Sequence, residues 1–270
     1  MKILNGAELA EYIKERQARQ VRALRQAHGV FPRLAIIQTT DDPVIGTYVR
    51  LKRRYGDDIL VDVVILKIDQ SQLMTTIEQV NNDPNVHGII IQLPLADVSE
   101  TQVAVDAVLG TKDVDGLGKD ALYQPATPMA IDWLVTGYNV ELKQKAIAIV
   151  GRGRLVGEPL ARLWRGAGHD VTILDKESDL TTELPKYDVI VSATGSVGVI
   201  NSDMLQIGAV IVDAGTAAEH GKIVGDIDQA VRTRDDLTIT PEKGGVGPLT
   251  VAALFDNVIR SAQEVARTTV

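Results

Sequence analysis

Tyr48 and Lys52 are spaced so that they could act together in proton transfer. Asp42 followed by Pro43 is typical of an N-cap and the first position of a helix. We expect the segment 44–56, which contains several charged residues, to form this helix. Side chains four residues apart share one helix face. A phenol beside an amine can relay a proton, and partial burial lowers the amine's proton affinity. Because three arginines lie close by, the spacing alone favours an ordinary solvated face.

A second group of polar residues follows apolar segments of the same half of the chain. Gln92 comes directly after the apolar run 88–91 and before Leu93. Ligands of open α/β sheets bind at the carboxyl ends of strands, so Gln92 either contacts a ligand or is a satisfied strand-end amide. The loop 112–116 (Lys-Asp-Val-Asp-Gly) contains two carboxylates, which either contact a substrate or cap the following turn.

A glycine-rich segment at 151–157 follows the apolar run 146–150 and opens a helical stretch. Such a turn lets backbone N–H groups approach a diphosphate at the positive end of the helix. The Gly-x-Gly-x-x-x-Gly spacing is one residue longer than the usual dinucleotide fingerprint, and a tight turn without a ligand is the alternative. The candidate cofactor-binding residues here are Gly151, Arg152, Gly153, Val156 and Gly157.

The charges near the next predicted strand bear on the choice of cofactor. Asp175 lies 24 positions after Gly151, where a carboxylate commonly binds the adenine-ribose hydroxyls and repels a 2′-phosphate, as in NAD enzymes. Arg152 and Lys176 are cations able to pair with a phosphate, which favours NADP. A solvated turn without a ligand is the third reading.

These residues are positioned by alternating helices and strands. Short apolar runs predict buried strands, and the stretches between them have helical spacing or read as loops, so we expect an α/β fold with parallel sheets. The expected strands are 34–37, 61–66 and 88–91, then 146–150, 171–174, 189–191 and 209–212. The expected helices include 7–27, 44–56, 71–82 and 251–267. The Asp-, Gly- and Pro-rich segment 113–128 separates the two series.

Composition excludes several classes of function. The 270 residues include no cysteine and four widely separated histidines, which argues against disulfides, cysteine nucleophiles and zinc. The net charge of −8 argues against nucleic acid or an anionic membrane as a partner. Neither a secretory signal nor an apolar run of about 18–20 residues is evident, so we expect a cytoplasmic protein.

Five motifs in one order make the chain similar to bifunctional methylenetetrahydrofolate dehydrogenase/methenyltetrahydrofolate cyclohydrolases. They are Tyr48-Val-Arg-Leu-Lys52, Gly88-Ile-Ile-Ile-Gln-Leu-Pro-Leu95, Lys112-Asp-Val-Asp-Gly116, the glycine segment 151–157 and Gly244-Gly-Val-Gly-Pro248. The resemblance implies a catalytic domain of residues 1–119 with 248–270. It also implies a Rossmann-like domain of residues 120–247, a C-terminal helix returning to the first domain, tetrahydrofolate bound between the domains, and a homodimer.

The resemblance also implies roles for individual residues. Lys52 matches the catalytic lysine, Tyr48 its ring-stacking and proton-relay partner, and Gln92 the amide that orients the lysine. Asp115 matches the carboxylate that holds the pterin ring. The remaining substrate contacts implied are Leu93, Gly247 and Pro248. Without the resemblance, the segment 244–250 has two interpretations: its backbone packs against a flat ring of a ligand, or it is a flexible connection.

The chain departs from the family pattern at the cofactor and in one loop. Residues 175–178 (Asp-Lys-Glu-Ser) replace a phosphate-friendly His-Ser-Arg-Thr, while Arg152 is retained, so we predict NADP with NAD as the rival. The loop after Gly116 is shorter than in the family. The alternatives are a single-activity enzyme, a non-catalytic folate- or nucleotide-binding relative, and a shikimate-type dehydrogenase; the last predicts neither Gln92 before Leu93-Pro94 nor the glycine run before Pro248.

Overall fold

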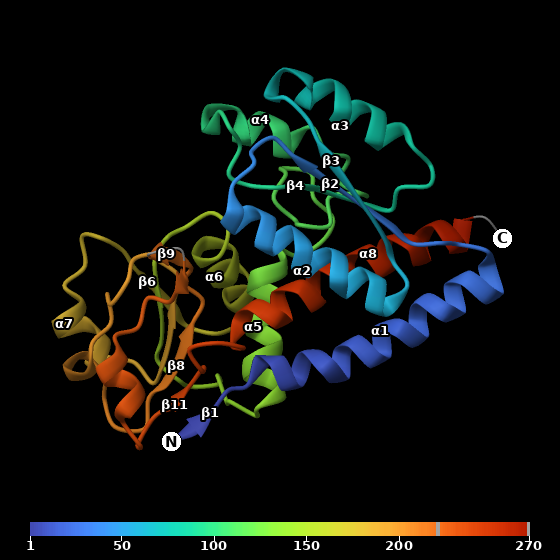
Figure 1. The fold of residues 1–270 in the computed structure, drawn as a ribbon. Coiled ribbons are helices and arrows are strands. Elements are labelled where there is room, and N and C mark those ends of the chain that lie inside the picture. The colour runs from blue at the N-terminus through green and yellow to red at the C-terminus, as the bar shows by residue number, and fades with distance from the viewer. Residues whose placement is uncertain (220–221, 269–270) are drawn as a thin grey trace. The chain divides into compact units, whose positions relative to one another are not determined.

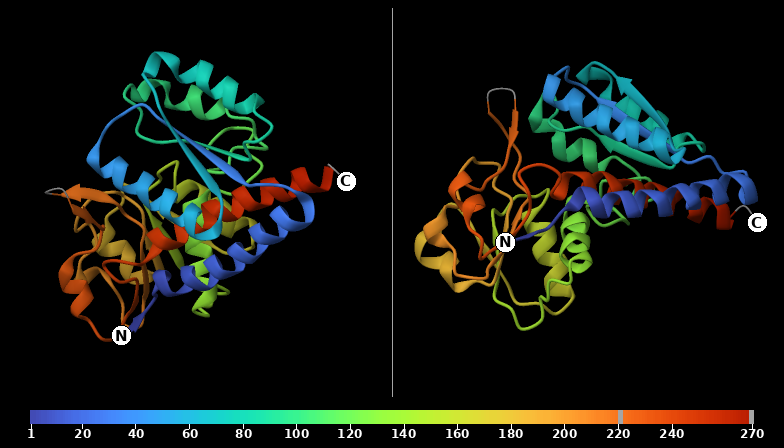
Figure 2. Two further views of the ribbon diagram at one scale, coloured as in Figure 1. Left: turned by 45° about the vertical axis from the view of Figure 1, so that its right-hand side comes forward. Right: turned by 60° about the horizontal axis from the view of Figure 1, so that its bottom comes forward.

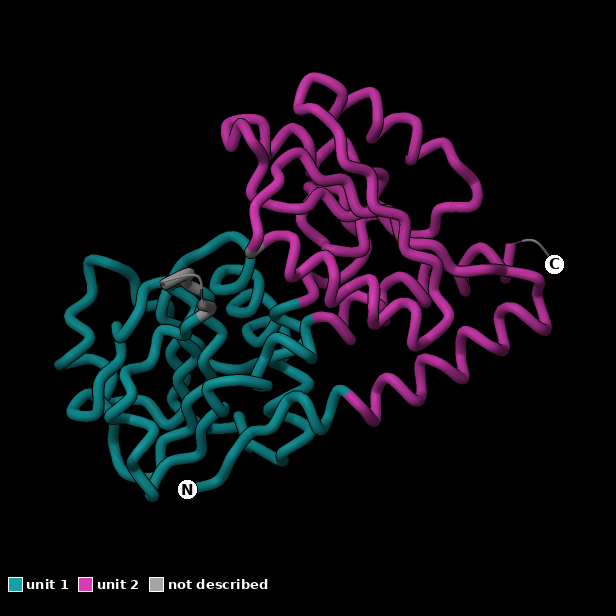
Figure 3. Tube along the Cα trace, in the orientation of Figure 1, with its two compact units in different colours: residues 1–10, 127–250 teal, residues 11–126, 251–270 magenta. Residues whose placement is uncertain are grey.

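The chain divides into two units (Figure 3), and each contains a sheet of parallel strands. The computed structural model describes residues 1–219 and 222–268. Unit 1 comprises Met1–Ala10 with Thr127–Thr250, and unit 2 comprises Glu11–Ala126 with Val251–Val270. The predicted α/β class is confirmed.

Unit 2 is built on a three-stranded parallel sheet in the order β3-β2-β4. The strands are β2 (Arg33–Gln38), β3 (Asp62–Lys67) and β4 (Gly88–Ile91). β2 is the central strand, and five of its six residues are buried, as expected for a strand covered on both faces. All three strands lie within two residues of their predicted limits.

Helices cover both faces of this sheet (Figure 1). α3 (Leu73–Asn82) and α4 (Thr101–Asp106) bury apolar side chains against one face. α2 (Pro43–Ile59) and α8 (Val246–Thr268) cover the other, where Gly56 lies so close to β3 that an added Cβ would be 2.4 Å from Val63. The sheet is thereby shielded from water everywhere except at its ends and edges.

The last helix belongs largely to unit 2. There it lies beside α1 (Gly6–His28), as both views of Figure 2 show for the parts of these helices within the unit. The buried Gln17 side chain donates to the Ala252 carbonyl at 2.8 Å, and Arg16 pairs with Asp256 at 2.7 Å. The predicted return of the C-terminal helix to the first domain is confirmed.

Unit 1 contains a six-stranded parallel sheet in the order β1-β11-β8-β7-β5-β6. Its strands are β1 (Lys2–Ile3), β5 (Ile147–Val150), β6 (Val171–Leu174), β7 (Val189–Ser192), β8 (Val210–Asp213) and β11 (Thr238–Ile239). The order reverses at β5, because β6 pairs on one side of it and β7 on the other. The strand β1, which the sequence pattern does not predict, carries the chain's first residues to the edge of this sheet.

The remaining elements are short apart from two helices of unit 1. These are α5 (Ala126–Gly137) and α6 (Gly157–Gly166), and the buried Trp164 of α6 donates from Nε1 to Asp132 of α5 at 2.9 Å. The others are α7 (Leu180–Glu183), the antiparallel pair β9 (Ala217–Glu219) and β10 (Lys222–Val224), and the 3₁₀ turns η1 (Gln70–Gln72), η2 (Val98–Glu100), η3 (Leu184–Lys186), η4 (Ser202–Met204) and η5 (Gln229–Thr233). Within residues 1–219 and 222–268, no helix has the length and apolarity needed to cross a membrane.

Candidate functional site

Lys52 and Gln92 are hydrogen-bonded to each other in unit 2. Asp42 caps α2 as predicted, accepting from the Ile45 amide at 3.1 Å, and α2 carries Lys52 toward the carboxyl end of β4. There the Lys52 Nζ donates to Gln92 Oε1 at 2.9 Å, and Gln92 Nε2 donates to the Leu93 carbonyl at 3.0 Å. The second bond fixes the orientation of the amide, so its oxygen faces the lysine.

The ionisation of this lysine is shifted by its surroundings. Burial lowers the pKa of Lys52 below its ordinary value of 10.5, although the negative charge of Asp115 opposes the shift. Burial likewise raises the pKa of Asp115, which the charge of Lys52 partly offsets. A partly buried amine whose pKa is lowered, beside a carboxylate, is an arrangement typical of proton-transfer sites.

Tyr48 lies one helical turn before Lys52 on α2 and is partly buried. The spacing places the two side chains on the same face, as the sequence predicted. The face also carries the apolar contacts of α2, because Ile45 and Val49 are buried. Lys52, whose Nζ donates to Gln92, is thus not a fully solvated side chain.

The two carboxylates of the loop 112–116 have different surroundings. Asp113 is buried and closes the turn, accepting from the Gly116 amide at 3.0 Å and the Gly118 amide at 2.7 Å. Lys112 reaches the C-terminal end of α3, where its ammonium donates to the carbonyls of Asn81 and Asp83 at 2.7 Å each. Asp113 is thus the capping residue and Asp115 the one whose charge acts on Lys52.

Two side chains of α8 hold the same loop from the other side. Asn257, which is fully buried, donates from Nδ2 to the carbonyls of Val114 at 2.9 Å and Gln124 at 3.0 Å. One turn later, Ser261 donates to the Thr111 carbonyl at 3.0 Å. The residue just before Asp115 is therefore fixed by a helix that begins more than a hundred positions later. No motif in the sequence indicated Asn257.

The glycine segment of unit 1 forms a tight connection between β5 and α6. Gly151 has φ +106°, and a Cβ there would be 2.6 Å from the Ala193 carbonyl oxygen. A Cβ at Gly157 would be 1.9 Å from the Gly151 oxygen, so this glycine lets the helix start directly against the loop. At Gly153 an added Cβ would meet nothing closer than 3.9 Å, which leaves this stretch of backbone open to a ligand.

Charged residues surround this loop. Arg152 is 58% exposed and lies 3.6 Å from Asp175, which follows β6, and 3.7 Å from Glu158 of α6. Asp175 also accepts from the Glu177 amide at 3.1 Å, so it caps the turn containing Lys176. Asp175 therefore caps a turn and also lies near the glycine loop.

A further loop lies at the same edge of the sheet and was missed in the sequence. The turn 193–196 follows β7, the neighbour of β5, and its first carbonyl oxygen touches the glycine loop. Because the strand order reverses between β6 and β7 around β5, this is the topological switch point at which open α/β sheets bind ligands. Its only sequence signal is a small-residue run after an apolar strand.

The last predicted contacts, Gly247 and Pro248, form the first turn of α8 and lie within unit 1. The preceding Gly244 has φ +82° and accepts at its carbonyl from the Ala7 amide at 2.8 Å. This segment is thus bound to the chain's first helix and is not merely a loose connection.

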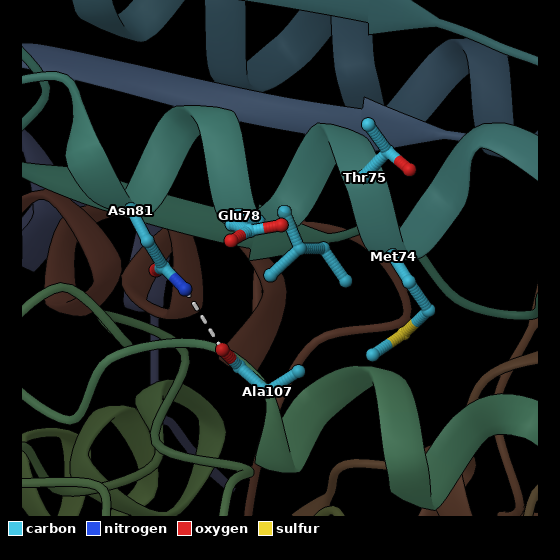
Figure 4. A pocket seen from close by; sticks show the side chains of 6 residues that line it. Met74, Thr75, Glu78, Asn81 and Ala107 are labelled. Carbon is cyan, nitrogen blue, oxygen red and sulfur yellow. Dashed lines mark hydrogen bonds between the residues drawn. The ribbon is translucent and has the colours of Figure 1, made fainter.

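A shallow depression elsewhere in unit 2 contains none of the predicted site residues (Figure 4). Asn81 on α3 donates across it to the Ala107 carbonyl at 2.8 Å, and Glu78 is its one ionisable lining residue. Among the described residues, no group of His, Cys, Asp and Glu could hold a metal ion.

Comparison with known proteins gives two family models that together match most of the chain. Residues 4–115 match the tetrahydrofolate dehydrogenase/cyclohydrolase catalytic domain. Residues 125–266 match the NAD(P)-binding domain of the same family. Two curated relatives are each named bifunctional protein FolD. The one from Nautilia profundicola is 34% identical and covers 99% of both chains; the one from Bordetella bronchiseptica is 35% identical and covers 98% of this chain and 99% of its own.

Solved structures give the same result. The FolD methylenetetrahydrofolate dehydrogenase/cyclohydrolase of Campylobacter jejuni is 31% identical with a TM-score of 0.91, covering 98% of this chain and 99% of its own. The enzyme of Trypanosoma brucei, in complex with NADP cofactor and an inhibitor, is 27% identical with a TM-score of 0.90 and covers 98% of each chain. The similarity extends over both units.

Proposed function

The chain belongs to the tetrahydrofolate dehydrogenase/cyclohydrolase family, and we propose that it catalyses both reactions of that name. It oxidises 5,10-methylenetetrahydrofolate to 5,10-methenyltetrahydrofolate with a nicotinamide cofactor, and then hydrolyses the product to 10-formyltetrahydrofolate. The observation that carries the proposal is the partly buried Lys52–Gln92 hydrogen bond beside the charge of Asp115, in a chain that also has a dinucleotide loop.

The glycine loop fits a dinucleotide cofactor. Gly151 and Gly157 permit the close turn, Gly153 leaves the backbone accessible, and α6 directs its positive end toward the loop. When bound, the cofactor supplies the hydride acceptor. We assign its binding to Gly151, Arg152, Gly153, Val156, Gly157, Asp175 and Lys176.

The preferred cofactor is NADP, with NAD as the rival. Arg152 and Lys176 supply positive charge for a 2′-phosphate, and the complex of the trypanosome relative contains NADP. Asp175 opposes this choice, because it lies 3.6 Å from Arg152 and its charge repels a phosphate. An exposed ion pair of this kind is weak, so a phosphate can compete for Arg152.

The hydrolytic step assigns a proton-transfer role to Lys52. Water forms a bond to the methenyl carbon and loses a proton, and the bond from that carbon to N5 then breaks as N5 gains a proton. The lowered pKa of Lys52 favours its neutral amine, which accepts the first proton and returns it to N5. Gln92 orients the amine throughout, because its oxygen accepts a hydrogen bond from Nζ.

The remaining residues are assigned to binding of the folate. Asp115 holds the pterin ring through its carboxylate, and Tyr48 stacks on the ring and relays protons. Leu93, Gly247 and Pro248 complete the contacts. Residues 1–119 with 248–270 form the catalytic domain, and residues 120–247 form the cofactor domain. We also assign the chain a homodimeric state and a cytoplasmic location, on the family resemblance and the acidic composition.

One assay tests both activities. The purified chain is given 5,10-methylenetetrahydrofolate with NADP or with NAD, and the reduced cofactor and methenyl absorbances are recorded together. We expect cofactor reduction, faster with NADP, and a methenyl signal that decays. A lasting methenyl signal would show a dehydrogenase without hydrolase activity, and no cofactor reduction would contradict the proposal.

A further inference from the structure

We propose that Asp226 is a positioning residue that holds the turn 193–196 in place as one wall of the nicotinamide-cofactor site. Asp226 is fully buried and follows β10 in the chain, far from the glycine loop in sequence. The inference rests on the proposed use of a nicotinamide cofactor by unit 1. It concerns a residue with no dinucleotide motif around it.

The carboxylate of Asp226 accepts three hydrogen bonds, two from the turn 193–196 and one from Ser192 at the end of β7. Its Oδ2 accepts from the Ser192 hydroxyl at 2.7 Å and from the Thr194 amide at 2.6 Å. Its Oδ1 accepts from the Ser196 amide at 3.1 Å. Charge-assisted bonds from backbone N–H groups are among the stronger ones in proteins, so the turn has little freedom on its inner side.

The outer side of the same turn is free to meet a ligand. Gly195 and Ser196 are exposed, and Gly195 has φ +68°. The turn follows β7 at the switch point of the sheet and touches the glycine loop through the Ala193 carbonyl oxygen. A dinucleotide seated on the glycine loop in the crevice between β5 and β7 therefore meets this turn next.

The surrounding structure is built around this carboxylate. A Cβ at position 215 would lie 1.9 Å from Asp226 Oδ1, so only glycine leaves room for the carboxylate there. The Asp226 amide donates to Asp213 Oδ1 at 3.1 Å, and Asp213 pairs with Arg232 at 2.9 Å in a largely buried ion pair. Burial and the charge of Asp226 raise the pKa of Asp213, which Arg232 opposes. Asp226, which accepts hydrogen bonds from the turn, is thus itself held in position by Asp213.

The variant Asp226→Asn tests the proposal with little change of shape. Both carboxylate oxygens accept hydrogen bonds, so either orientation of an asparagine amide places its NH₂ against at least one donor of the turn. We expect the dissociation constant for NADP, measured by calorimetry on the full chain, to rise about tenfold. Hydrolysis of 5,10-methenyltetrahydrofolate without cofactor should be unchanged, because it needs no nicotinamide.

Two control variants separate positioning from general loss of stability. Asp228→Asn changes an exposed carboxylate of the same segment that accepts from the Ala230 amide at 2.7 Å, and this variant should bind NADP like the parent. Asp132→Ala removes the partner of Trp164 in the same unit, so it should lower the melting temperature without changing NADP binding. A weakened NADP affinity in Asp132→Ala equal to that of Asp226→Asn would contradict a positioning role.

If Asp226→Asn does not fold, a milder variant tests the positioning role of Asp226. Ser192→Ala removes one of the three donors and should weaken NADP binding several-fold, to a smaller extent than Asp226→Asn. Unchanged NADP affinity in a folded Asp226→Asn, or in Ser192→Ala when the first variant fails to fold, overturns the inference. Failure of the parent chain to bind NADP or NAD would instead contradict the proposed function.

Discussion

Lys52 and Gln92 join the middle of α2 to the carboxyl end of β4 through one hydrogen bond of 2.9 Å. The glutamine has no freedom to rotate its amide without loss, because its Nε2 already donates to Leu93. Its oxygen therefore accepts from the amine whether Lys52 is charged or neutral. The glutamine fixes the position of Nζ without fixing its protonation, as a residue that exchanges protons requires.

Replacement of Lys52 by methionine should remove the hydrolytic activity. Proton transfer by a positioned side chain contributes about 10²–10⁴-fold to a rate, so we expect the rate of methenyl hydrolysis to fall at least about 100-fold in Lys52→Met. Arg53→Met, which changes an exposed neighbouring cation on α2, is the control and should retain the rate. Full hydrolysis by a folded Lys52→Met would remove the lysine from the mechanism.

The charge of Asp115 should raise the pKa of Lys52 and so limit the lowering caused by burial. The carboxylate raises the pKa of the amine against the lowering effect of burial, so Asp115→Asn leaves burial unopposed and should lower the pKa of Lys52 further. The shift can be followed by carbon-13 NMR of labelled lysine side chains, with the Lys52 signal identified through Lys52→Met. Asp120→Asn, an exposed change in the same loop, should leave that signal unmoved.

Local sequence signals predicted the helices and strands of the sheets well. The N-cap at Asp42 and the apolar runs before Gln92 and Gly151 needed only neighbouring residues, and the structure has them within a few residues of the expected limits. These signals depend on periodicity and capping, which a single segment displays without its tertiary partners.

The missed features depend on residues distant in the chain. β1 exists because two residues at the start pair with β11, which local periodicity cannot show. From the residues alone, either carboxylate of the loop 112–116 could cap the turn, and only packing of the loop shows that Asp113 does so. Asn257 and Asp226 act through backbone groups of remote loops, so their own sequence neighbours give no signal.

Cofactor preference should respond in opposite directions to two substitutions near the glycine loop. Arg152→Ala removes a charge-assisted partner for a 2′-phosphate and should weaken NADP binding about tenfold, with a smaller effect on NAD. Asp175→Asn removes a repulsive charge and should favour NADP over NAD more strongly than in the parent.

Dissociation constants for both cofactors, measured at low and high salt, give the comparison. Arg162→Ala, an exposed change on α6, is the control for loss of a positive charge from this unit. Equal loss of NADP and NAD affinity in Arg152→Ala would show that Arg152 contacts a part common to both cofactors.

His87 should make unit 2 less stable in acid. The ring is 5% exposed, its Nδ1 accepts from the Arg33 amide at 3.3 Å, and burial lowers its pKa below 6.5. As the pH falls below 6.5, the unfolded chain takes up a proton that the folded chain resists, so this part of the stability is lost progressively.

A neutral substitute tests this pH dependence. His87→Asn retains an acceptor and should show a shallower loss of the free energy of unfolding as the pH falls below 6.5. His28→Asn, which changes an exposed histidine at the end of α1, should follow the parent curve. Parallel curves for the parent and His87→Asn in urea titrations would show that His87 does not cause the acid loss.

Asn257 should stabilise the loop that carries Asp115 and thereby folate binding. Asn257→Ala leaves the carbonyls of Val114 and Gln124 without their donor in a buried site, which we expect to lower the free energy of unfolding by about 3 kcal/mol. The Michaelis constant for the folate should rise while the dissociation constant for NADP stays constant, because the loop belongs to unit 2 and the glycine loop to unit 1. Arg260→Ala changes an exposed side chain of the same helix and should alter neither quantity. If Asn257→Ala loses stability but keeps the parent's Michaelis constant for the folate, then Asn257 supports the fold and does not position Asp115.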